Sequence, residues 1–140
     1  MTTVPEPVDP FDLPPWLGEA DVVWSPEGAI GAAALVPGHL RGSSEGEVPC
    51  DLLAVDEAYP APVADDALRS RAHQSWRHGQ VHLVSYAGRL TLLVPGREFT
   101  ADRVLDALGR LALALGGHPD KMSAVLNVGR DATRRAGSGR

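Results

Sequence analysis

The sequence predicts a single α+β domain, with an antiparallel sheet of about five strands and two main helices. Three observations predict it. A chain of 140 residues has the length of one domain. Short apolar runs separated by Gly and Pro form two groups, as is typical of strands joined by tight turns. A segment with apolar residues at helical spacing follows each group, so the predicted order is β-β-β-α-β-β-α, with the helices on one face or at the ends of the sheet.

Two flexible tails should flank a domain that spans residues 16–128. Residues 1–15 hold five prolines and three carboxylates, which favours an extended strap. A short helical turn is expected over residues 15–20, because proline suits the first turn of a helix. Residues 129–140 are rich in Arg and predict a disordered C-terminal tail. We expect four apolar side chains to anchor the end of the strap: Phe11, Leu13, Trp16 and Leu17.

The first three strands are expected over residues 21–25, 29–36 and 50–56. A proline follows each of the first two and should end it. Residues 39–49 are rich in Gly, Ser and Glu and lack periodicity, which predicts a mobile loop or a turn between strands. The third strand is apolar on both of its alternating faces, so we expect both faces to be covered.

The first main helix is expected over residues 64–78. Its apolar residues are four apart and form a thin stripe, and Gly79 should end it. The stripe consists of Ala64, Leu68, Ala72 and Trp76.

A β-hairpin should follow, with strands over residues 80–86 and 90–94. The turn between them contains Gly88, which supplies the positive φ that a tight turn requires.

The second main helix is expected over residues 101–115, with Thr100 as its N-cap. Its apolar stripe is wide and could exceed what one sheet face covers. A short helix is expected over residues 120–128. The stripe consists of Val104, Leu105, Leu108, Leu111, Ala112 and Leu115.

Charge is divided unevenly along the chain, whose net charge is −5. The first 66 residues contain 13 acidic residues and one basic residue, and the other 74 contain five acidic and twelve basic residues. This asymmetry favours an acidic surface that pairs with a basic surface, either within the chain or on a partner.

Several classes of protein are disfavoured. Cys50 is the only cysteine, so no intrachain disulfide can form, as fits a reducing compartment. No apolar run approaches the ~20 residues of a membrane span, and the first 15 residues lack the features of a secretory signal. No phosphate-binding glycine motif or nucleophile elbow is present. We therefore expect a cytoplasmic protein without a cofactor and without a membrane partner.

The predicted order of elements is similar to that of small, acidic, dimeric folds of the secretion-chaperone type. The similarity concerns element order alone, so it assigns no functional residue.

A row of basic side chains on the first main helix is the best candidate site. Arg69, His73 and Arg77 are four apart and should share one flank, where they could bind a carboxylate, a phosphate or an acidic protein surface. Trp76 lies beside them, either in the core or at a partner interface. The alternative is an ordinary solvated helix face.

Three other groups of residues are candidate sites. His73, His78 and His82 could bind a metal, but their spacing does not fit one helical face. Cys50 lies among carboxylates that should raise its pKa, so a structural cysteine is favoured over a nucleophile. Carboxylates near Asp56 could bind a cation, but solubility or charge pairing explains them as well.

The interpretation we favour is a non-enzymatic protein-interaction module or small complex subunit. It would bind a protein partner, either itself or another chain, through complementary charge and an apolar helix face. One alternative is a metal-binding or small-ligand-binding enzyme domain that uses the His73, His78 and His82 region. A further, less favoured alternative is a nucleic-acid accessory protein that binds through the arginines of the C-terminal tail. These are Arg130, Arg134, Arg135 and Arg140.

Overall fold

The structure is a computed structural model. It describes residues 5–27, 35–43, 46–56, 66–96, 99–125 and 133–135. In these residues the chain forms three α-helices, two short 3₁₀ segments and nine strands. The class α+β is confirmed, but the prediction of an antiparallel sheet of about five strands is wrong, because the sheet is larger and mixed.

Eight strands follow one another across the sheet in the order β1-β6-β7-β5-β4-β2-β8-β9, and β3 pairs with β5 beside β4. Two neighbouring pairs are parallel, namely β5 with β7 and β2 with β8. The bounds of the nine strands are β1 Glu6–Pro7, β2 Val22–Pro26, β3 Leu35–Val36, β4 Gly38–Gly42, β5 Glu47–Ala54, β6 His82–Tyr86, β7 Arg89–Val94, β8 Met122–Val125 and β9 Thr133–Arg135.

The parallel pairs join strands that are distant in sequence. Helix α2 (Asp66–Arg77) and β6 lie between β5 and β7 in the chain and provide the crossover that a parallel pair requires. β6 then forms a hairpin with β7 on the side away from β5. The antiparallel prediction assumed that neighbouring strands in sequence are neighbours in the sheet, and this assumption fails here.

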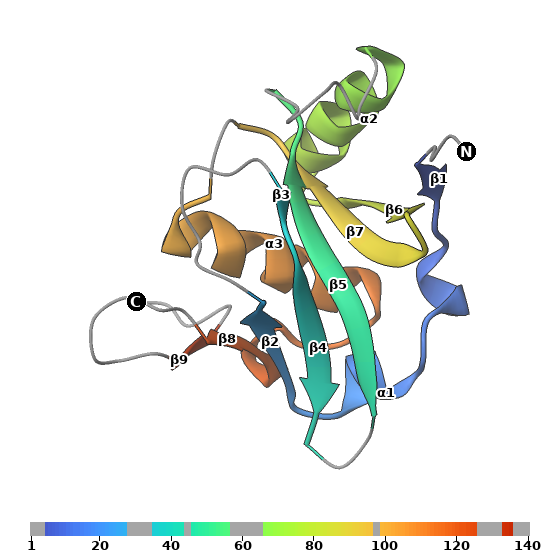
Figure 1. Ribbon diagram of the computed structural model, residues 1–140. Coiled ribbons are helices and arrows are strands. Elements are labelled where there is room, and N and C mark those ends of the chain that lie inside the picture. The colour runs from blue at the N-terminus through green and yellow to red at the C-terminus, as the bar shows by residue number, and fades with distance from the viewer. Residues whose placement is uncertain are drawn as a thin grey trace.

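The predicted loop over residues 39–49 is also wrong for most of its length. Gly38–Gly42 forms β4, which pairs with β2 on one side and with β5 on the other. β5 begins at Glu47 and is the longest strand of the sheet (Figure 1). The sequence did not predict this strand because β4 contains the polar residues His39 and Arg41. These residues lie on an open face of this part of the sheet, where polar side chains are expected.

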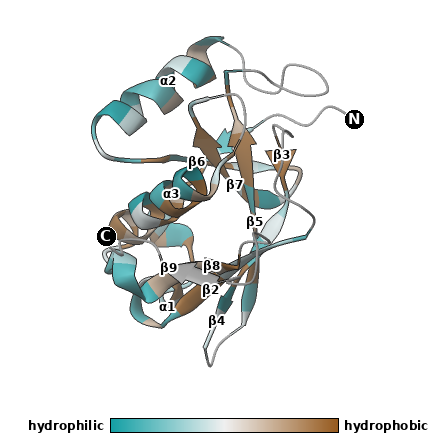
Figure 2. Ribbon diagram, turned by 90° about the vertical axis from the view of Figure 1, so that its left-hand side faces the viewer, coloured by the Kyte–Doolittle hydropathy of each residue, from teal (hydrophilic) through white to brown (hydrophobic). Residues whose placement is uncertain are grey.

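Two helices cover opposite faces of the sheet around β5, which corrects the prediction that the helices lie on one face or at its ends. Helix α3 (Ala101–Ala114) packs on the face that carries Leu52 and Leu92, and α2 packs on the face that carries Leu53 and Leu93. The prediction that both faces of this strand are covered is confirmed. In Figure 2 the apolar colour is concentrated in β6, β7 and the side of α3 that faces the strands.

The local predictions with the clearest signals are confirmed. β6 and β7 form the hairpin, with Ala87 and Gly88 both at positive φ in its turn. Thr100 caps α3, since its side chain accepts a hydrogen bond from the N–H of Arg103. The helical turn near residue 16 is α1 (Trp16–Glu19).

The described part of the N-terminal strap lies along the outer edge of β6. β1 pairs with β6, and a 3₁₀ turn (Pro10–Asp12) leads to α1 (Figure 1). Leu17 is buried, and Leu13 and Trp16 pack against the core, as predicted. Phe11 is not an anchor, because its side chain is 94% exposed.

The C-terminal predictions need correction. Residues 119–121 form a 3₁₀ turn and Met122–Val125 forms β8, where a short helix over 120–128 was predicted. Met122 and Ala124 alternate toward the core, a period-two pattern too short to distinguish from a helix. β9 lies within the predicted disordered tail and pairs with β8. Residues 129–132 and 136–140 lie outside the described residues, so the tail as a whole stays a prediction.

Candidate functional site

Helix α2 places the predicted cationic row on its outer surface. Leu68 and Ala72 are buried against the sheet and fix the rotation of the helix. Arg69 and His73 are therefore half-buried at its flank, and Arg77 is exposed one turn further on.

The row lines a shallow hollow of about 420 Å³ together with Asp56, Ser70 and Gln74. Asp56 lies just beyond β5, and its Oδ1 is 2.6 Å from Nε2 of His73. Arg69 pairs with Asp66 of its own helix. Arg77 forms no ion pair with any residue that the structure describes.

Trp76 does not line this hollow. Its ring is partly buried against the α3 core, and the guanidinium of Arg110 lies 3.6 Å from the ring centroid. Arg110 also donates to the carbonyls of Trp76 and Gln80, at 2.7 and 3.1 Å. The structure thus assigns Trp76 to the packing between α2 and α3 and separates it from the other three predicted residues.

The three candidate metal-binding histidines have different surroundings. His73 contacts Asp56, and Nδ1 of His78 lies 2.9 Å from the carbonyl of Gln74. His82 lies on β6, where burial and nearby Arg71 lower its pKa. Over the described residues, no three His, Cys, Asp or Glu side chains come together in a way that could hold a metal ion.

Cys50 is fully buried in the core. Burial raises the pKa of its thiol, the neighbouring carboxylate of Asp51 adds to the effect, and Arg89 opposes it. A thiol that stays protonated is a poor nucleophile, so this environment fits the structural interpretation. The acidic segment after Asp56 cannot be compared, since residues 57–65 lie outside the described residues.

A second charged cluster, centred on Arg89, was not predicted. The guanidinium donates through Nε and Nη2 to both carboxylate oxygens of Asp51, at 2.9 to 3.1 Å. Its Nη2 also lies 2.9 Å from Oε2 of Glu27 and 3.1 Å from the carbonyl of Gly38. Glu27 and Glu47 flank Nδ1 of His39 at 3.1 and 3.8 Å.

This Arg89 cluster connects β4, β5 and β7, and Glu27 directly after β2, on the open face of the sheet. Asp51 is 5% exposed, and its Oδ1 also accepts the N–H of Gly38 at 3.1 Å. Every charge in the cluster has an opposite partner, which favours a structural role. One sequence signal could have found it, because Asp51 shares a strand face with the apolar Leu53 and a carboxylate there requires a partner.

Comparison with protein-family models, with curated proteins and with solved structures gave no match to this chain. In the part of the chain that the structure describes, no helix is both long and apolar enough to cross a membrane.

Proposed function

We propose that this chain is a non-enzymatic protein-interaction module that binds an acidic segment of a partner protein through the outer face of α2. The observation that carries the proposal is the hollow lined by Arg69, His73 and Arg77. It presents two guanidinium groups and an imidazole in one row, and among the described residues Arg77 has no carboxylate partner.

The charge of α2 is local and opposite to that of the whole chain. Within Asp66–Arg77 the helix carries three arginines and one carboxylate, whereas the chain has a net charge of −5. A general electrostatic attraction to anions is therefore not expected, and an acidic partner should be drawn to this face in particular.

A carboxylate of the chain itself already lies in the hollow. The carboxylate of Asp56 already contacts His73, with both side chains 39% exposed. A carboxylate of a partner could occupy the adjacent position beside Arg77, since guanidinium groups suit carboxylates.

The apolar face of α3 does not serve as the second contact expected from the sequence. Val104, Leu108 and Leu111 are buried under the sheet, so the stripe is covered within the chain. Leu113 is the exposed large apolar residue of this helix, at 59%. The proposal therefore depends on charge rather than on a free apolar stripe.

The test is a titration of fluorescently labelled octaglutamate followed by anisotropy at low ionic strength. We expect the wild type to bind and the double variant R69E/R77E to bind about tenfold more weakly or worse, because like charges then face the peptide. The matched control is R41E, which reverses an exposed arginine on β4, away from α2.

Two outcomes would reject the proposal. One is the absence of binding by the wild type, and the other is an equal loss in R41E, which would show a general charge effect. Sedimentation velocity of the wild type and of R69E/R77E then tells whether the acidic partner is a second copy of the chain, since only self-association through α2 would be lost in the variant.

A further inference from the structure

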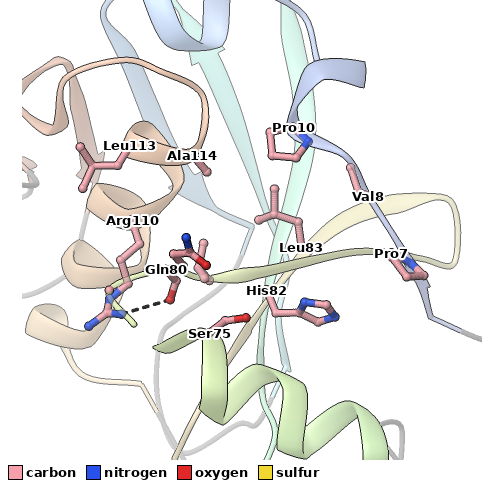
Figure 3. Close-up of a pocket in the computed structure, with 12 residues that line it drawn as sticks. Pro7, Val8, Pro10, Ser75, Gln80, His82, Leu83, Arg110, Leu113 and Ala114 are labelled. Carbon is pink, nitrogen blue, oxygen red and sulfur yellow. Dashed lines mark hydrogen bonds between the residues drawn. The ribbon is translucent and has the colours of Figure 1, made fainter. Parts of the chain in front are cut away.

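A cavity of about 410 Å³ lies at the outer edge of β6, away from the α2 hollow. Figure 3 shows the strap residues Pro7, Val8 and Pro10 on one side of it and Leu113 and Ala114 of α3 on the other, with Leu83 between them. The volume is that of a small ligand site, and the walls are mixed, with apolar side chains beside the polar residues Ser75, Gln80 and Arg110.

The edge of β6 already accepts an extended chain along part of its length. Glu6 and Pro7 of the strap pair antiparallel with Ser85 and Val84. The N–H of Val8 then donates to the carbonyl of Leu83 at 3.0 Å.

The strap leaves this edge immediately afterwards. Pro10 has no N–H and begins a 3₁₀ turn, and the side chain of Asp9 accepts a hydrogen bond from the N–H of Phe11. The next outward-facing position of the edge is therefore not reached by the strap.

That position is Val81. The carbonyl of Leu83 points outward, so alternation along the strand also directs the N–H and carbonyl of Val81 outward. Val81 is only 7% exposed and lines the cavity, yet its backbone makes no hydrogen bond with any described residue. Unpaired groups on the edge of a sheet are those to which a further strand can add, so this position can accept one.

A second polar group near the cavity also lacks a hydrogen-bond partner, but it has no accessible surface there. Nε2 of His82 is buried and has no hydrogen-bond partner among the described residues. Burial and Arg71 lower the pKa of His82, which favours a neutral ring. The charge of Arg110, which also lines the cavity, is offset by Asp106 at 2.9 Å. The polar groups left to a ligand in the cavity are thus the neutral backbone groups of Val81 rather than a strong charge.

We propose that this cavity binds a short, extended, apolar peptide segment of a partner protein, which adds to the edge of β6 where the strap ends. A peptide backbone provides the donor and the acceptor that Val81 lacks, and the strap demonstrates that the same edge accepts such a segment. An apolar side chain of the peptide fills the space between Val8, Leu83 and Leu113. The inference is independent of the proposed function of α2, because it uses a different surface.

The probe is the tripeptide acetyl-Leu-Val-Leu-amide, compared with the same peptide N-methylated at every residue. Binding is followed by amide NMR shifts, and amide hydrogen exchange is measured at Val81 and at Val84. We expect saturation to slow exchange at Val81 about tenfold, with no change at Val84. The methylated peptide should bind about tenfold more weakly, because none of its three residues has a backbone N–H to donate.

A cavity-filling variant provides a second test. A114F places a ring at an exposed position that lines the cavity, whereas A67F places the same ring at an exposed position of α2 outside it. Both should fold, and only A114F should weaken binding of the tripeptide, by about tenfold.

Three results would overturn the proposal. The first is equal affinity for the two peptides, and the second is binding that A114F leaves unchanged. The third is strong protection of the Val81 amide in the free protein, which would show that a segment of this chain already occupies the edge.

Discussion

Replacing Arg89 by Met should destabilise the fold substantially, because it leaves a buried carboxylate without its cation. Met retains much of the apolar stem of Arg and removes only the guanidinium. Asp51 is 5% exposed and would retain the N–H of Gly38, at 3.1 Å, as its remaining hydrogen-bond donor in the Arg89 cluster.

The magnitude follows from the burial of the pair. Removing one partner of a buried ion pair typically costs about 3–5 kcal/mol. The side chain of Arg89 is 28% exposed, so water can partly hydrate the carboxylate that remains, and we expect about 3 kcal/mol. The matched control is Arg41→Met, whose ion pair with Glu47 is exposed, at 71% and 41%; its loss should cost less than about 1 kcal/mol.

The assay is urea unfolding followed by circular dichroism, since guanidinium would screen the charges under study. A double-mutant cycle with Asp51→Asn isolates the interaction between the two side chains, and the coupling free energy should be about 1–3 kcal/mol. The reasoning is refuted if Arg89→Met costs no more than Arg41→Met, or if the two changes of the cycle are additive.

Three further predictions concern the core. Gly38→Ala should lower the free energy of unfolding in urea by about 1–3 kcal/mol, because the added Cβ would lie 2.6 Å from the buried indole of Trp24. Gly46→Ala should be nearly neutral, because no atom lies within 4 Å of the added Cβ. Leu111→Ala should lower the free energy of unfolding by about 2–5 kcal/mol, whereas Leu113→Ala on the exposed side of the same helix should change it by less than about 0.5 kcal/mol; similar losses would contradict the packing of α3. The Cys50 thiol should resist an aromatic disulfide reagent in the native protein and react once urea unfolds it, because burial raises its pKa; fast reaction of the native protein would show that the thiol is accessible.

The sequence by itself determined the elements whose causes are local. The β6–β7 hairpin follows from Gly88 between two apolar runs, and the start of α3 follows from the Thr100 cap and an apolar stripe. The row of Arg69, His73 and Arg77 follows from the spacing of four within one helix. These features depend on residues within a few positions of one another, so a single sequence contains their whole cause.

Only the tertiary structure decided which distant segments are neighbours. The parallel pairing of β5 with β7 and of β2 with β8 has no local signature, because each strand satisfies its backbone equally well with any suitable partner. The same is true of the pair of Asp51 and Arg89, which are 38 positions apart. It is also true of the cavity at Val81, which exists because the strap leaves β6 at Pro10. These sites depend on long-range packing, and their physical cause is found only in the folded chain.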